Sequence, residues 1–187
     1  MSRVGVLALQ GDVREHMRIL ENLGAEAIEV KKPGQIDSIE AMVIPGGEST
    51  TIGKMAVRFG ILDPIRDVIS GGMPVYGTCA GMILLAAAVA DGDQPLVGAL
   101  DVVVKRNAFG RQNESFEADL DVEGLDEPFH AVFIRAPWIE KVGSDVEVLS
   151  EFDDHPVMVR QGRILATSFH PELTGDGRIH RMLLDLI

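Results

Sequence analysis

The sequence has 187 residues, of which 46% are hydrophobic and 25% are charged, and these values predict one globular domain over residues 1–187. The net charge of −12 argues against nucleic acid as a partner, because an acidic surface repels phosphate. No apolar run reaches the roughly 18 residues of a membrane span. Residues 1–3 lead straight into a strand-like segment without a signal peptide, so we expect a cytoplasmic protein that does not bind membranes.

Short apolar runs alternate with helical patterns in the first half of the chain. The predicted strands are residues 4–9, 25–30, 41–44 and 73–76. The predicted helices are residues 12–23, 49–59, 62–70 and 80–90. Repeated strand–helix–strand units favour a parallel sheet with helices on both faces, so the predicted fold class is α/β, a three-layer sandwich.

The second half of the chain is rich in short strands separated by tight turns. They are predicted at residues 96–105, 115–122, 130–135, 146–152, 157–160 and 164–168. We expect them to extend the same sheet with antiparallel strands, which would make the sheet mixed but mostly parallel. A closing helix is predicted over residues 178–186.

Cys79 is the only cysteine in the chain, so an intramolecular disulfide is impossible, and no sequence motif indicates a metal or a cofactor. It stands in Gly77-Thr78-Cys79-Ala80-Gly81, between a predicted strand and a predicted helix, which is the pattern of a nucleophile elbow. The tight turn requires small flanking residues, and a helix N-terminus favours the thiolate. The alternative is a small buried cysteine that packs as a hydrophobic residue.

A cysteine hydrolase also needs a histidine and a group that orients it. His170 follows the last predicted strand, and Glu172 stands two residues later. Because alternate residues of an extended backbone point the same way, we expect Glu172 to hold one imidazole nitrogen while the other faces Cys79. The alternative is a surface His-Pro-Glu turn. The other histidines are expected to have no catalytic role: His16 on a helix surface, His155 and His180 in solvent, and His130 packed at the start of a strand.

Acyl transfer from an amide develops negative charge on the carbonyl oxygen, which backbone amides can stabilise. The amide of Ala80, directly after the nucleophile, is one expected donor. The second is expected at Gly47, in the glycine-rich loop after the third predicted strand. Residues 47–55 superficially resemble a phosphate-binding P-loop, but the spacing differs by one residue and Met55 replaces the hydroxyl residue that would hold magnesium. Nucleotide binding is therefore not predicted.

Together, these motifs and His170-Pro171-Glu172 resemble those of the class I (triad-type) glutamine amidotransferases. The resemblance is stronger still to the glutaminases that serve pyridoxal 5′-phosphate synthases, and it covers essentially the whole chain. Four segments carry this finer resemblance: residues 5–12, residues 46–51, residues 106–112 with 115–117, and residues 133–137. The resemblance implies the amidotransferase α/β sandwich as the fold.

The resemblance implies that the chain hydrolyses L-glutamine to L-glutamate and ammonia through a glutamyl thioester on Cys79. His170 would move the protons, and Glu172 would orient it. The residues implied to bind glutamine are Gly46, Gly47, Glu48, Ser49, Arg106, Ile134 and Arg135. An arginine fork suits the α-carboxylate of glutamine, although each arginine could instead form an ordinary surface ion pair.

A partner is also implied, because the sequence contains no synthase domain. In the family, ammonia passes through a channel to a separate (β/α)₈-barrel synthase subunit that builds pyridoxal 5′-phosphate, and the glutaminase is weak until that subunit docks. We therefore expect the loop at residues 46–49 to change its backbone conformation on docking. Two other classes stay open: another cysteine hydrolase of the same fold class, such as a peptidase or deglycase, and a regulator without catalytic activity.

Overall fold

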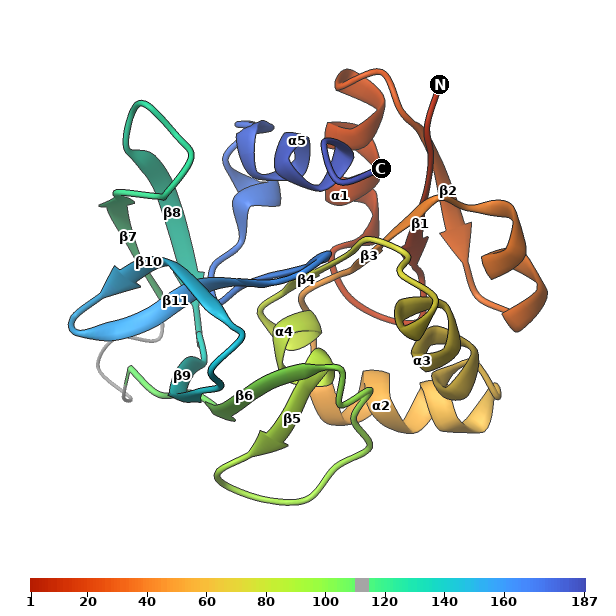
Figure 1. The fold of residues 1–187 in the computed structure, drawn as a ribbon, viewed down its shortest axis with the longest axis horizontal. Helices are drawn as coiled ribbons and strands as arrows, with labels where there is room; N and C mark the ends of the chain where they lie inside the picture. Colours follow the sequence, from red (N-terminus) through yellow and green to blue (C-terminus); the bar gives the residue numbers. More distant parts are fainter. Residues whose placement is uncertain (110–114) are drawn as a thin grey trace.

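A computed structural model describes residues 1–109 and 115–187 (Figure 1). The helices are α1 (Val13–Asn22), η1 (Pro33–Ser38), α2 (Ser49–Arg58), α3 (Leu62–Ser70), α4 (Ala80–Leu85), η2 (Pro171–Leu173) and α5 (Arg178–Leu184), where η marks a 3₁₀ helix. The strands of the first half are β1 (Arg3–Leu7), β2 (Glu26–Val30), β3 (Ala41–Ile44), β4 (Val75–Thr78) and β5 (Ala86–Val89). Those of the second half are β6 (Leu100–Lys105), β7 (Ser115–Leu120), β8 (Phe129–Ile134), β9 (Trp138–Val142), β10 (Glu147–Phe152), β11 (His155–Gln161) and β12 (Ile164–Thr167).

The central sheet has the strand order β10-β11-β12-β4-β3-β1-β2. Strands β2, β1, β3, β4 and β12 run parallel to one another, whereas β11 and β10 are added antiparallel beside β12. The predicted mixed, mostly parallel sheet is confirmed. Because β12 lies directly beside β4, with Thr167 opposite Thr78, the segments that follow these two strands emerge together at one edge of the sheet.

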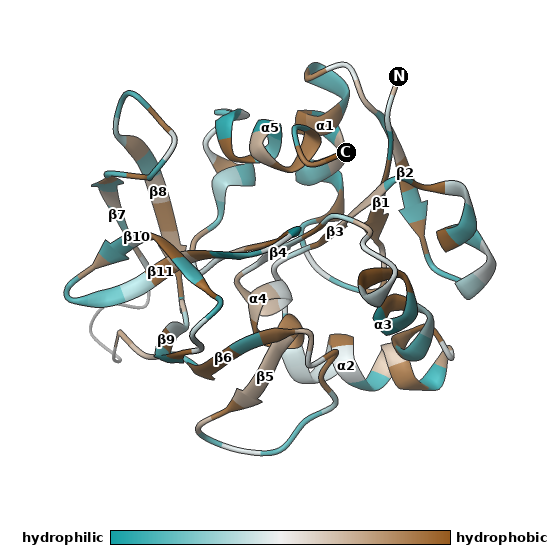
Figure 2. Ribbon diagram, viewed as in Figure 1, coloured by the Kyte–Doolittle hydropathy of each residue, from teal (hydrophilic) through white to brown (hydrophobic). Residues whose placement is uncertain are grey.

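Helices cover both faces of this sheet. In Figure 1, α1 and α5 lie on one side and α2, α3 and α4 on the other. Side chains alternate between the two layers along each strand: on β3, Met42 and Ile44 join the core under α2 and α3, and Ala41 and Val43 join the core under α1 and α5. The central strands are accordingly mostly apolar (Figure 2). The three-layer α/β prediction is correct.

The expectation that every strand of the second half extends the central sheet is wrong. Strands β5, β6 and β9 form one small sheet, and β7 and β8 form another. In β6 and β8 every second residue is fully buried, which suits a strand that lays one face on a layer of the core rather than one enclosed on both faces. The β7–β8 hairpin covers the α1 and α5 side, and β6 and β9 the other.

The helix predicted over residues 80–90 is too long. Helix α4 ends at Leu85, where Ala86 takes φ −58° and ψ 151°, and the next residues form β5 against β6. Alanine is the strongest helix former, but intrinsic propensities differ by less than about 1 kcal/mol per residue, so pairing with a neighbouring strand overrides this preference. Strand β9 and the 3₁₀ helix η1 were not predicted. Among the described residues, no helix combines the length and hydropathy needed to cross a bilayer.

Candidate active site

Cys79 stands at the turn between β4 and α4, as its motif predicts. Its backbone has φ 48° and ψ −101°, a conformation that non-glycine residues seldom adopt and that is held only where the surroundings enforce it. Part of that enforcement comes from β12, because the Cys79 amide donates to the Thr167 carbonyl at 2.7 Å. The strained turn directs the thiol away from the sheet, as in a nucleophile elbow.

The glycines that flank the nucleophile are required by close backbone contacts. A Cβ on Gly81 would lie 2.0 Å from the carbonyl oxygen of Ile44, and one on Gly77 would lie 2.7 Å from the carbonyl carbon of Gly81. Both contacts are with backbone atoms that cannot move aside easily. The Gly-x-Cys-x-Gly pattern therefore reflects packing between β3, β4 and the start of α4.

His170 and Glu172 lie side by side, as predicted. The Nδ1 atom of His170 is 2.7 Å from Oε1 of Glu172, and both side chains are buried. The backbone between them is not extended, however, because Pro171 opens the 3₁₀ helix η2. The turn brings the two side chains together, so the geometric reason expected from the sequence is wrong although its result is right.

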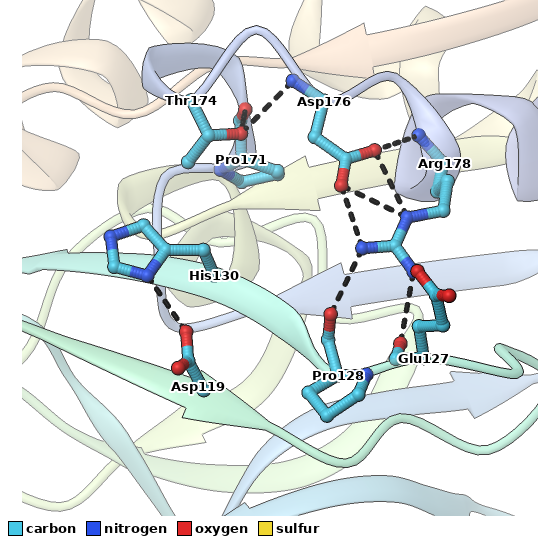
Figure 3. A network of polar contacts seen from close by, with 8 residues as sticks. All are labelled: Asp119, Glu127, Pro128, His130, Pro171, Thr174, Asp176 and Arg178. Carbon is cyan, nitrogen blue, oxygen red and sulfur yellow. Dashed lines mark hydrogen bonds and ion pairs between the residues drawn. The ribbon is translucent and has the colours of Figure 1, made fainter.

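The segment that carries Glu172 is anchored on both sides. The His170 amide donates to the Val132 carbonyl of β8 at 2.8 Å. After the triad, Arg178 pairs with Asp176 and donates to the carbonyls of Glu127 and Pro128, ahead of β8, at 2.9 and 3.0 Å (Figure 3). The loop between His170 and α5 is thus tied to the β7–β8 hairpin.

Asp12 is a further carboxylate at the triad. Its Oδ2 lies 3.4 Å from Nδ1 of His170, so two carboxylates share this nitrogen. Burial disfavours the charge on the imidazole, but hydrogen bonds to Asp12, Cys79 and Glu172 outweigh it and raise the pKa of His170 to about 12. His170 is therefore a stable partner for a thiolate at Cys79.

The same pairing keeps Glu172 ionised. Burial alone would raise the pKa of a carboxyl, but the charges and hydrogen bonds of His16 and His170 prevail and hold the pKa of Glu172 well below its usual range. Asp12, His170 and Glu172 also bring possible ligand atoms within 4.8 Å of one another. Nδ1 of His170 already bonds Glu172 at 2.7 Å, and we assign this grouping no metal.

Cys79 and His170 line a cavity of about 400 Å³. The residues around it that the sequence predicted as substrate-binding are Gly47, Glu48, Ser49, Arg106, Ile134 and Arg135. Those that it did not predict are Gln10, Asp12, Ile83, Asn107 and Leu173. The volume suits a small metabolite. Gly46 and Ala80 stand behind these lining residues: a Cβ on Gly46 would lie 2.4 Å from Cε1 of His170, and Ala80 is buried at the start of α4.

Comparisons with known proteins identify the family of this chain. The model of the SNO glutamine amidotransferase family matches residues 6–187. The chain belongs to this family of glutamine amidotransferases. It is 61% identical to the pyridoxal 5′-phosphate synthase subunit PdxT of a Parafrankia species, over 99% of this chain and 93% of the relative. It is 59% identical to the subunit of the same name from Streptomyces coelicolor, over 98% and 93% of the two chains.

A solved amidotransferase structure has nearly the same backbone. The crystal structure of a glutamine amidotransferase superposes with a TM-score of 0.94 at 55% sequence identity, over 98% of this chain and 97% of that chain. The predicted class I amidotransferase fold is therefore correct for this family member. Of the segments that suggested the family, Gly110, Arg111 and Gln112 lie outside the described residues.

The glutamine-binding residues expected in this amidotransferase are already held by neighbours. The Glu48 carboxylate caps α2 by accepting from the amides of Thr50 and Thr51 at 3.1 and 2.8 Å. Arg106 donates to the Asp91 carbonyl at 2.7 Å and approaches Gln94 Oε1 at 3.3 Å. These contacts position the charged groups at the cavity before a ligand arrives.

Two residues at the end of β8 complete the rim of the cavity. Arg135 is exposed and has φ 45°, a left-handed conformation that interrupts the strand and turns its side chain to the cavity. The carbonyl of Ile134 lies 4.0 Å from Sγ of Cys79. The sequence could not reveal the conformation at Arg135, because neither neighbour is a turn residue.

Gln10 and Asp12 are the main residues that sequence reasoning missed. Gln10 Oε1 accepts from the Glu48 amide at 2.7 Å, and the Asp12 amide donates to the Gly46 carbonyl at 3.2 Å. A signal for them existed, since both follow β1 and so reach the same sheet edge as Cys79. They hold the loop at residues 46–49 against the cavity.

The expectations for three of the other histidines are wrong. His16 and His180 are fully buried, and His130 is exposed between Asp119 and Glu117 rather than packed. His155 is half-buried and stacks on Trp138 with ring centroids 3.7 Å apart. Helix α1 turns His16 toward the sheet, because every third or fourth residue of a helix faces the core.

Proposed function

We propose that this chain hydrolyses L-glutamine to L-glutamate and ammonia and delivers the ammonia to a pyridoxal 5′-phosphate synthase subunit. One observation carries the reaction: the elbow thiol of Cys79 opens on the same cavity as His170, whose Nδ1 bonds Glu172 at 2.7 Å. The relatives named as pyridoxal 5′-phosphate synthase subunits support the biosynthetic role. Residues 1–187 would act as a single amidotransferase domain.

In the first half of the reaction, His170 holds the proton of the Cys79 thiol, and Sγ, as the thiolate, attacks the side-chain amide carbon of glutamine. The amides of Ala80 and Gly47 stabilise the oxyanion that forms. When the intermediate collapses, the C–N bond breaks and the leaving nitrogen takes the proton of His170, so that ammonia departs and a glutamyl thioester remains on Cys79.

In the second half, water attacks the thioester while His170 accepts one of its protons. The C–S bond breaks and glutamate leaves, which restores the Cys79 thiolate beside the protonated His170. Glu172 keeps the imidazole oriented and stabilises its charged form in both halves. Each group begins the next cycle in its original state.

Recognition of free glutamine requires groups for its α-carboxylate and its α-ammonium. Arg106 and Arg135 at the rim of the cavity suit the carboxylate. The carboxylate of Glu48 suits the ammonium, and Ser49, Gly46, Gly47 and the Ile134 backbone complete the contacts. This charge pattern separates glutamine from a glutamine residue inside a peptide, which lacks both termini.

The partner that receives the ammonia is proposed to be a (β/α)₈-barrel synthase subunit in a hetero-oligomeric complex. The loop at residues 46–49 would respond to docking, because its glycines permit a change of peptide orientation, and its hydrogen bonds with Gln10 and Asp12 would adjust with it. A change in the orientation of the Gly47 peptide would complete the oxyanion hole. Activity of the isolated chain would then be low.

The test is a glutamate-release assay of the chain alone and with the synthase subunit of the same organism. Free glutamine is the substrate, and a glutamine-containing peptide and a glycated amine serve as competitors for the peptidase and deglycase alternatives. We expect free glutamine to be the only one of the three substrates that is turned over, and we expect the synthase subunit to increase its turnover. Turnover of the peptide or the glycated amine instead would favour another hydrolase, and no turnover under any condition would favour a regulator.

A further inference from the structure

A chain of buried polar side chains continues from the triad into the core. The Nε2 atom of His16 lies 3.5 Å from Oε1 of Glu172 and 3.2 Å from the hydroxyl of Thr78. The other ring nitrogen, Nδ1, lies 2.8 Å from Nε2 of His180. The side chains of His16 and Glu172 are fully inaccessible. The contacts join α1, α5, the end of β4 and η2 behind the catalytic cavity.

We propose that His16 is a positioning residue that keeps Glu172 ionised and oriented while His170 gives up its proton during the reaction. The triad is thereby extended into the series Cys79, His170, Glu172, His16 and His180. The inference rests on the proposed glutaminase function, because it assigns His16 a part in that reaction.

The atoms that face one another fix the direction of this interaction. An ionised carboxylate only accepts hydrogen bonds, so the nitrogen of His16 that faces Glu172 must carry a hydrogen. Burial and the neighbouring His16 lower the pKa of His180 to about 3, so His180 is neutral and bonds the remaining nitrogen of His16. His180 thus holds the ring of His16 with Nε2 toward the carboxylate.

Glu172 needs His16 as a second hydrogen-bond partner because its first partner, His170, loses a proton during the reaction. His170 loses its positive charge each time it protonates the leaving nitrogen. A buried carboxylate without a compensating group is costly, and Oε2 of Glu172 has no hydrogen-bond partner among the described residues. His16 supplies a donor at Oε1 at the step when His170 becomes neutral.

The other ionisable groups near this carboxylate cannot replace His16. Burial and the charge of Glu172 raise the pKa of Tyr76 well above its usual range, so its hydroxyl stays neutral and pairs with Thr167 at 3.0 Å. Asp12 approaches His170 rather than Glu172. His180 reaches Glu172 only through His16.

A matched pair of substitutions tests whether Nε2 or Nδ1 of His16 supports the reaction. The amide of Gln reaches about as far as Nε2 of histidine, and that of Asn about as far as Nδ1, so H16Q keeps a donor toward Glu172 and H16N does not. We expect H16N to lower kcat roughly 10-fold or more, with KM for glutamine changed less than about 2-fold. H16Q should recover most of the loss. The assay contains the synthase subunit, and H130Q serves as an exposed control.

A second readout does not depend on glutamine turnover. Cys79 is the only cysteine, so its rate of alkylation by iodoacetamide at each pH reports the Cys79–His170 pair alone. Without the donor from His16, Glu172 is held less firmly in its ionised, oriented form and therefore stabilises protonated His170 less. The rise in thiolate reactivity of Cys79 should then move to higher pH in H16N and in H16L. H16Q should stay close to the wild-type profile.

Equal loss of kcat in H16Q and H16N, or a wild-type alkylation profile in H16L, would overturn the proposal. If H16N does not fold, as judged by thermal melting, the comparison of H16L with H16Q replaces it. Failure of the proposed function is distinguishable, because the wild-type protein itself would then release no glutamate, whereas the alkylation profiles would still report the role of His16.

Discussion

Nδ1 of His170 contacts the carboxylates of both Glu172 and Asp12, at 2.7 and 3.4 Å. Of these two carboxylates, only Glu172 is buried and within a short hydrogen-bond distance of the imidazole, so we assign Glu172 the orienting role. Replacing Glu172 with Gln should lower kcat by about 100-fold or more, because the amide cannot stabilise the imidazolium, with little change in KM. Replacing Asp12 with Asn should cost less. Steady-state kinetics with the synthase present check the order, and a larger loss in D12N would contradict it.

The stability of the protein should depend on the charge of His170. Its pKa is raised from 6.5 to about 12, so its stabilising contribution is fully present below about pH 6.5 and declines as the pH rises toward 12. The wild-type protein should therefore lose its advantage over H170Q by about 2 to 3 kcal/mol between about pH 7 and about pH 9. Urea unfolding of both proteins measures this, and a constant difference would be inconsistent with the pairing.

Glu172 should produce the opposite dependence at low pH. Its pKa is lowered from 4.5, so its contribution is present above that pH and is lost as the pH falls below it. E172Q lacks this contribution. The stability difference between the wild-type protein and E172Q should therefore shrink below about pH 4.5, which acid unfolding followed by circular dichroism can measure. A difference that grows toward lower pH would disprove the assignment.

The arginines at the rim of the cavity should act on substrate binding rather than on chemistry. R135A and R106A should each raise KM for glutamine about 10-fold or more, because each removes a charge-assisted contact with the α-carboxylate, and kcat should change less. R106K should recover part of the loss as a point charge. Arg58, exposed at the end of α2, provides the matched control, since R58A should leave both constants unchanged. Unchanged KM in R135A would remove this residue from the site.

Packing at the elbow should make Gly81 intolerant of any side chain. In G81A the new methyl group would lie 2.0 Å from the Ile44 carbonyl, so we expect a loss of about 3 kcal/mol in the free energy of unfolding. A methyl group added at Gly34 in η1 would have no neighbour within 4 Å, so G34A should change stability by less than about 1 kcal/mol. Thermal melting of both variants provides the comparison. Equal melting temperatures would show that the elbow relaxes more easily than its contacts indicate.

The sequence predicted the central part of the fold well because its signals there are local. Buried strands such as β3 are continuous apolar runs, and the elbow motif sits where a strand must turn into a helix. The small sheets were mispredicted because the choice of partner strand is a long-range property. Residues 86–89 read as helix from their alanines, and only pairing with β6 makes them a strand.

Some residues of the candidate site could be predicted from the sequence and others could not. Cys79, His170 and Glu172 have recognisable spacing, and the family resemblance supplied Arg106 and Arg135. Asp12 lies in one of the segments that carry the resemblance but was assigned no role, and the position of His16 depends on which side of α1 faces the sheet. A helix residue at the carboxyl edge of a parallel sheet therefore merits inspection even when its sequence context suggests an ordinary surface position.

The central claim is that Cys79 attacks the glutamine amide. It is tested most directly by glutamate release from C79A bound to the synthase subunit. Binding should be unchanged, because the substitution removes only a small buried group, and hydrolysis should fall to the uncatalysed background. Glutamate release by the C79A complex at a rate close to that of the wild-type complex would contradict the mechanism.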